Sequence, residues 1–87
     1  MSESTADLRA LTELLAKGLA EAPDEVVVTA EGDEDELSIE VEVAEGDLGR
    51  VIGRGGRTAK ALRQVLSAAA SRQGTRCRLD ILEPEEL

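Results

Sequence analysis

The spacing of the apolar residues changes along this 87-residue chain, and this change constrains the fold more than any other feature. Leucines recur at helical spacing over residues 6–21, which predicts an amphipathic helix that opens with a capping box of Ser4 and Asp7. The β-branched run 26–29 predicts a strand. Residues 37–43 alternate apolar and polar side chains and predict a second strand, joined to the first in a hairpin by an acidic turn.

The second half of the chain returns to helical spacing and then to alternation. Asp47 is a candidate N-cap for a short helix over 47–52, and a long amphipathic helix is predicted over 57–72. Residues 76–81 alternate again and predict a third strand. The resulting order is helix, strand, strand, short helix, long helix, strand. It predicts an α+β domain of two layers, in which helices cover one face of a three-stranded sheet.

The length predicts a single domain over residues 1–87, with a folded core at about 6–82 and a flexible acidic tail at 83–87. The chain has no Phe, Tyr or Trp, so Leu, Val, Ile and Ala must fill the core. Cys77 lies on the apolar side of the third strand and is expected in that core. With one Cys and no His, the chain is expected to form no internal disulfide and to hold no metal or cofactor.

Several classes of protein are disfavoured by what the sequence lacks. No apolar run approaches the ~20 residues that span a bilayer, and the acidic N-terminus lacks the apolar segment of a signal peptide. A cytoplasmic location without membrane contact is therefore expected. The carboxylates stand without a nearby His or nucleophile pattern, so no catalytic residues are predicted and the chain is not expected to be an enzyme.

Charge is distributed unevenly along the chain. The formal net charge is −9, yet residues 48–79 contain eight basic side chains and no acidic one, while all 19 acidic residues lie outside that window. This segregation predicts that an anionic partner docks on one part of the surface. Arg76 and Arg78, on the third strand, are expected to pair across the sheet with Glu40 and Glu42.

Three glycines and three cations gather at the junction of the two predicted helices. Gly53, Gly55 and Gly56 carry no Cβ, so another molecule can approach the main chain closely. The helix that follows presents unpaired N–H groups and the positive end of its dipole, which favour phosphate. We interpret this junction as a binding site for a phosphodiester backbone. The candidate binding residues are Arg50, Val51, Ile52, Gly53, Arg54, Gly55, Gly56, Arg57, Lys60 and Arg63.

Other glycine motifs fit the junction less well. A Walker A loop ends in Gly-Lys-Ser/Thr, which is absent here. A dinucleotide fingerprint needs a third glycine where this chain has Thr58, and a strand where residues 48–52 have helical character. A plain tight turn between helices is the remaining alternative, although a turn alone does not require the flanking arginines.

The segment Val51–Gly56 resembles the V-I-G-x-x-G signature of KH domains, with Gly53–Gly56 as the GXXG loop. The order of elements resembles the type II, bacterial KH arrangement. Residues 48–70, LGRVIGRGGRTAKALRQVLSAAA, and the PDEV that follows the first helix resemble the KhpA family of small stand-alone bacterial KH proteins. The resemblance covers about residues 8–82.

This resemblance implies that the chain binds single-stranded RNA, with the GXXG loop clamping about four nucleotides. Val51, Ile52 and the inner side of the 57–72 helix would line an apolar groove for bases. It also implies post-transcriptional regulation as an RNA chaperone, roles in cell shape and division, and a homodimer or a pair with KhpB, a larger KH-containing protein. A rival hypothesis is an adaptor that acts mainly through such pairing, with weak or no RNA binding. The residues leave RNA and single-stranded DNA undistinguished.

Two departures from the family pattern bear on binding. Glu45-Gly46-Asp47 stands where relatives often have Pro-Glu-Asp, and Gly55 leaves Arg54 as the one charged residue inside the loop. Because aromatic residues are absent, bases must be contacted by aliphatic walls, arginine planes and main-chain groups. Binding dominated by phosphate contacts is therefore expected, with log K falling against log salt at a slope of about −2 to −3.

Overall fold

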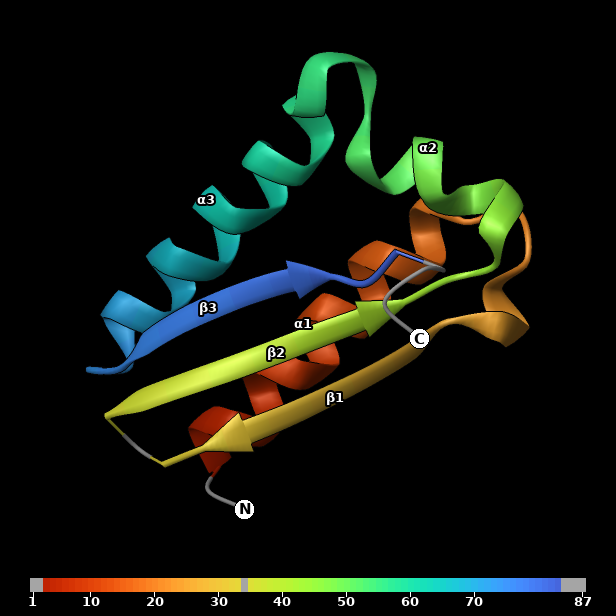
Figure 1. The fold of residues 1–87 in the computed structure, drawn as a ribbon. Coiled ribbons are helices and arrows are strands. Elements are labelled where there is room, and N and C mark those ends of the chain that lie inside the picture. The colour runs from red at the N-terminus through yellow and green to blue at the C-terminus, as the bar shows by residue number, and fades with distance from the viewer. Residues whose placement is uncertain (1–2, 34, 84–87) are drawn as a thin grey trace.

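The computed structural model describes residues 3–33 and 35–83 and places helices on one face of a three-stranded mixed sheet (Figure 1). The single-sided covering follows from the alternation in the central strand, where Leu37, Ile39 and Val41 are buried while Glu36 and Glu40 are exposed. The elements are α1 (Glu3–Leu19), β1 (Val27–Gly32), β2 (Glu36–Glu42), α2 (Leu48–Ile52), α3 (Arg57–Arg72) and β3 (Arg76–Ile81). The predicted two-layer α+β class is confirmed.

The strand order in the sheet is β1-β2-β3. Strands β1 and β2 form the predicted antiparallel hairpin, with Val28 opposite Val41. Strand β3 pairs parallel to β2, with Leu79 opposite Ile39. A parallel neighbour requires a crossover connection, and α2 and α3 supply it.

The core is aliphatic, as the composition requires. It joins the inner faces of α1, α3 and all three strands, and Cys77 packs against it half-buried. Burial raises the pKa of the Cys77 thiol. The buried cluster comprises Leu8, Ala16, Val26, Val28, Leu37, Ile39, Val41, Leu66, Ala70 and Leu79.

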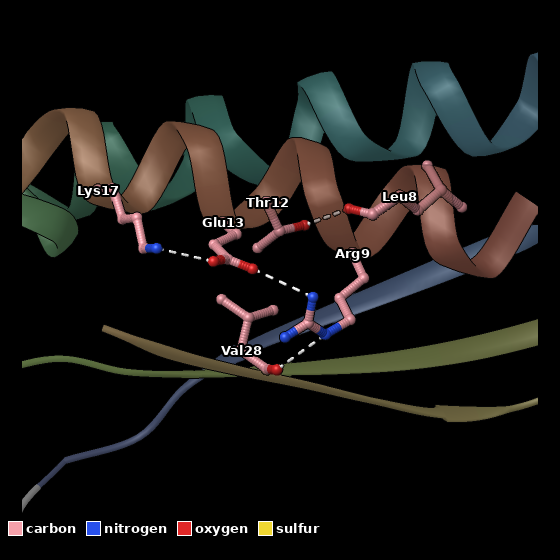
Figure 2. Close-up of polar contacts among 6 residues, drawn as sticks. All are labelled: Leu8, Arg9, Thr12, Glu13, Lys17 and Val28. Atoms are coloured by element: carbon pink, nitrogen blue, oxygen red, sulfur yellow. Dashed lines mark hydrogen bonds and ion pairs between the residues drawn. The ribbon is translucent and has the colours of Figure 1, made fainter. Parts of the chain in front are cut away.

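A polar contact fastens α1 to the edge of β1 (Figure 2). The Nε of Arg9 donates a hydrogen bond to the carbonyl of Val28 at 3.1 Å. The carboxylate of Glu13 lies 3.1 Å from the same guanidinium and 2.8 Å from the Nζ of Lys17. Both cations, Lys17 first, lower the pKa of Glu13.

Several predicted boundaries differ from the structure. Helix α1 is already helical at Glu3, so Ser4 lies inside it and does not act as the predicted N-cap. It ends at Leu19, two residues before the expected end. Strand β1 continues to Gly32, where a turn was predicted, because its ladder with β2 extends to the pair of Gly32 and Leu37. Within the predicted tail 83–87, residues 84–87 lie outside the described part of the chain.

The predicted pairing of Arg76 and Arg78 with Glu40 and Glu42 is wrong. The parallel register places Arg76 opposite Glu36 and Arg78 opposite Ser38, while Glu40 faces Asp80. Arg78 instead approaches the carboxylate of Asp80 on its own strand, at 4.0 Å. Sequence alternation shows which face a side chain occupies, but it does not show how far one strand is shifted along its neighbour.

No helix in the described part of the chain is both long enough and apolar enough to span a membrane.

Candidate nucleic-acid interface

The glycine-rich junction forms a tight exposed turn between α2 and α3, at the end of α3 that lies farther from the sheet (Figure 1). Gly53, Gly55 and Gly56 all have positive φ, at 79°, 63° and 78°. A Cβ on Gly53 would overlap the side chain of Thr58, whereas the space around Gly55 and Gly56 is open. The turn thus combines one glycine required by packing with two that leave the main chain open to a large molecule.

The N-terminus of α3 adjoins this turn. Gly56 occupies the cap position in the left-handed conformation, and within the described residues no side chain caps the helix. The N–H groups of Gly56 and Arg57 already donate to the carbonyls of Gly53 and Arg54 inside the turn. The positive end of the α3 dipole lies here and favours an anion such as phosphate.

Arg54, Arg57 and Lys60 surround the turn with exposed positive charge. Within residues 3–33 and 35–83, none of the three forms an ion pair or a side-chain hydrogen bond. Described carboxylates therefore do not neutralise these side chains. Their charge is available to a ligand.

Two other predicted binding residues are engaged inside the molecule. Arg50 donates to the carboxylate of Glu21 at 2.8 Å and lies 3.4 Å from that of Asp47, so much of its charge is already balanced. Arg63 donates from its Nε to the carbonyl of Leu79 on β3 at 3.2 Å, although its side chain is exposed. These two arginines are held in place, unlike those at the turn.

Val51 and Ile52 are the last two residues of α2, directly before the turn, and their side chains differ in solvent exposure. Val51 is 0% exposed, so it offers no surface to a base and instead packs α2 against the body of the domain. Ile52 is half-buried and keeps an exposed apolar edge. Of the two predicted apolar contacts, the structure presents Ile52 at the surface.

Asp47 holds α2 in place by a contact that the sequence did not predict. Its two carboxylate oxygens accept hydrogen bonds from the N–H groups of Glu21 and Ala22, each at 2.9 Å, and it is 3% exposed. These bonds, and then the charge of Arg50, lower its pKa despite burial. Asp47 therefore does not cap α2 with its side chain. No local signal could reveal partners 25 and 26 residues away.

An apolar groove runs between α1 and α3, on a different face of α3 from Arg63. Leu14 and Val65 protrude at its rim, 70% and 47% exposed. The groove is lined by Leu14, Leu15, Gly18, Leu19, Thr58, Ala61, Leu62 and Val65.

A family model described as "KhpA/KhpB, KH domain" matches residues 9–81, a span that contains the whole turn and every strand. The chain belongs to the KhpA/KhpB KH-domain family. Residues 53–56 have the sequence Gly-Arg-Gly-Gly and are called the GXXG loop below. The predicted resemblance to the KhpA family is thereby confirmed.

Curated relatives from bacteria match over most of the chain. The "RNA-binding protein KhpA" of Halalkalibacterium halodurans is 47% identical over 76 residues, covering 87% of this chain and 100% of the relative. The protein of the same name from Leifsonia xyli is 47% identical over 74 residues, covering 85% and 93%. That from Aquifex aeolicus is 43% identical over 76 residues, covering 87% and 96%. No solved structure matches.

Proposed function

We propose that this KH domain binds short single-stranded RNA through the GXXG loop and the first turns of α3. The observation that carries the proposal is the exposed loop with three unneutralised cations, Arg54, Arg57 and Lys60, in a chain of net charge −9. The three relatives above are each named RNA-binding protein, which agrees with it. The role we infer is post-transcriptional regulation in the cytoplasm, with no enzymatic step.

The binding mode follows from the loop geometry. The sugar-phosphate backbone approaches Gly55 and Gly56, where the absence of side chains permits close contact. The positive end of the α3 dipole favours a phosphate beside the loop, and the three cations balance the neighbouring phosphates. Ile52 contacts a base from the side of α2.

The test is a titration of a fluorescent octanucleotide RNA against the wild type and a Gly55→Asp, Gly56→Asp variant. Both positions have positive φ and open space, which Asp tolerates better than most residues. The added carboxylates face phosphate, so affinity should fall by about tenfold or more. The same sequence as DNA reports whether the 2′-hydroxyl contributes.

The matched control is Gly74→Asp. Gly74 also has positive φ, at 74°, and open space around it, but it lies at the opposite end of α3. It should bind RNA as the wild type does. If the folded loop variant binds RNA as tightly as the wild type, RNA binding through this loop is wrong and the adaptor hypothesis gains support.

A second function, self-association, is favoured by the uncharged surface around the groove. Exposed small and apolar residues follow one another along both helices: Ala10, Leu14 and Gly18 on α1, and Ala61, Val65 and Ala68 on α3. In a chain with 33% charged residues, such a patch is unusual and can face its own copy across a two-fold axis. We propose a second copy of this chain as its occupant.

Sedimentation analysis of the wild type and of Val65→Glu tests this second function. A buried carboxylate at the centre of the patch should convert a dimer to a monomer while leaving RNA affinity per chain unchanged. Gln64→Glu, which adds the same charge on the neighbouring exposed position, is the control. A monomeric wild type would rule out the homodimer, and mixing it with KhpB would then show whether that protein uses the patch.

A further inference from the structure

A protein that binds single-stranded RNA needs flat side chains on which bases can stack. This chain has no aromatic residue to provide them. Arginine guanidinium groups are the other planar surface on which RNA bases stack in proteins. Such a surface is effective when the side chain is already held in one orientation, because ordering a long arginine side chain costs conformational entropy. The question is which arginine is both oriented and exposed beside the loop.

Arg63 meets both requirements. Its Nε donates to the carbonyl of Leu79 at 3.2 Å, which fixes one edge of the guanidinium against β3. Its side chain is exposed, and within residues 3–33 and 35–83 it has no other hydrogen bond and no ion pair. The two terminal Nη groups and a face of the plane are therefore available. By contrast, no hydrogen bond or ion pair with another described residue orients the side chain of Arg54 or Arg57, and Arg50 is paired with carboxylates.

The bond to Leu79 uses the free edge of the sheet. Arg76 and Leu82 donate their N–H groups toward β2, to the carbonyls of Asp35 and Val41 at 3.1 and 2.9 Å. In a parallel ladder alternate residues face opposite ways, so Leu79 turns its main-chain groups outward. Since β3 is the last strand in the sheet, nothing in the sheet competes with Arg63 for that carbonyl. The anchor is part of the fold and does not depend on a ligand.

The spacing from the loop suits a base of the same bound segment. Arg63 follows Gly56 by seven residues, which is about 10 Å along the axis of α3. Four nucleotides, the length that a KH domain holds, extend over about the same distance when their bases are spaced at about 3.4 Å. Lys60 lies on the same flank of the helix, three residues earlier, and can contact a phosphate between the two points.

We propose that Arg63 is a stacking platform for one base of the RNA held by the GXXG loop. The proposal rests on the proposed RNA binding and assigns Arg63 a role distinct from that of Arg54, Arg57 and Lys60. Those three balance phosphate charge, whereas Arg63 presents a plane whose orientation Leu79 fixes. The role depends on the guanidinium and not on its charge alone.

Affinity measurements distinguish base stacking on the guanidinium plane of Arg63 from the effect of its positive charge. The probe is an octaadenylate RNA and a matched RNA in which the sugars are retained and the bases removed. Arg63→Lys keeps the charge and loses the plane, so it should weaken binding of octaadenylate by about 5- to 150-fold and leave the abasic RNA unaffected. Arg72→Lys, the same exchange at the end of α3 far from the loop, is the control and should change neither affinity. Circular dichroism verifies that each variant is folded.

A second measurement uses the wild type alone. Because the chain has no aromatic residue, any ring-current shift in its nuclear magnetic resonance spectrum must come from RNA bases. Octaadenylate should shift the Hε resonance of Arg63 upfield, and the abasic RNA should not.

The outcomes are distinct. Equal binding of octaadenylate by wild type and Arg63→Lys, or an unshifted Hε resonance in the bound state, would overturn the platform while leaving RNA binding intact. A loss of affinity that is the same for both RNAs would make Arg63 another phosphate contact and would also overturn it. A wild type that binds neither RNA would overturn both the platform and the proposed function.

Discussion

At residue 53 the backbone has φ 79° and ψ 169°, a combination open essentially to glycine alone. The position is also closed sterically, because a Cβ there would lie 2.7 Å from the main-chain nitrogen of Thr58 as well as against its side chain. Thr58 belongs to the first turn of α3, so Gly53 allows that helix to start close behind the end of α2. Among the three loop glycines with positive φ, Gly53 is the one that packing against Thr58 also requires.

Gly53→Ala should therefore lower the free energy of unfolding by about 1–3 kcal/mol from backbone strain, with the overlap on Thr58 adding to it. Urea unfolding followed by far-ultraviolet circular dichroism measures this, since the chain has no Trp fluorescence. Gly49→Ala is the control. It lies inside α2 with open space around it, and alanine there should raise stability by up to about 1 kcal/mol. Equal stability of Gly53→Ala and wild type would contradict the steric argument.

At the scale of the elements, the five-residue helix α2 is too short to be stable alone and depends on its attachments. Asp47 at its start binds the main chain that leaves α1, and buried Val51 fixes its inner side. Arg50 adds an ion pair to Glu21 across the same junction. The loop is consequently positioned by α1 as well as by the helices that flank it.

The tether through Asp47 should make stability depend on pH. The two N–H groups and Arg50 hold the pKa of this carboxyl below its usual range, so the folded state favours its ionised form. The stabilisation is present above the unfolded pKa of about 3.9 and is lost as the pH falls through the lower, folded pKa. The stability difference between wild type and Asp47→Asn should be largest above about pH 4 and shrink below it.

Urea unfolding at a series of pH values measures that difference. Glu45→Gln is the control, because Glu45 is exposed and its side chain has no hydrogen bond in the described part of the chain. It should track the wild type at every pH. A stability difference for Asp47→Asn that does not change with pH would show that the charge of Asp47 is unimportant and that only its shape matters.

The elements show which features of the fold can be predicted from the sequence alone. The ranges of α3 and β3 were predicted correctly, since helical spacing and alternation are local properties. Gly56 precedes α3, and Gly74 separates α3 from β3. The parallel register of β3, which Arg76 and Arg78 depend on, was missed because the crossover through α2 and α3 sets it. The partners of Asp47 and Arg63 were missed for the same reason, as each lies on an element brought close only by the fold.

At the scale of the whole molecule, the segregation of charge seen in the sequence is kept in space around the loop but not at the other end of α3, where Arg76 lies opposite Glu36. The three unneutralised cations lie at the N-terminal end of α3, and Arg72, Arg76 and Arg78 lie around its other end and the start of β3 (Figure 1). Most of the described acidic residues lie on α1, on β1 and β2 and in the segments next to these elements. At physiological salt the Debye length is about 8 Å, so a ligand at the loop is influenced mainly by the charges within that distance.

Two variants of equal net charge distinguish whether RNA binding depends on the position of the cations or on the net charge of the domain. Wild-type binding to octanucleotide RNA should weaken with salt at a slope of about −2, the value for three neutralised phosphates on a single strand. Replacing Arg54, Arg57 and Lys60 by Gln should bring the slope close to zero, because the released counterions are those displaced by these side chains. Replacing Arg72, Arg76 and Arg78 by Gln removes the same charge from the distant end and should leave the slope unchanged. If both triple variants reduced the slope equally, the domain would respond to its net charge as a whole, and the loop would not be the place where RNA is held.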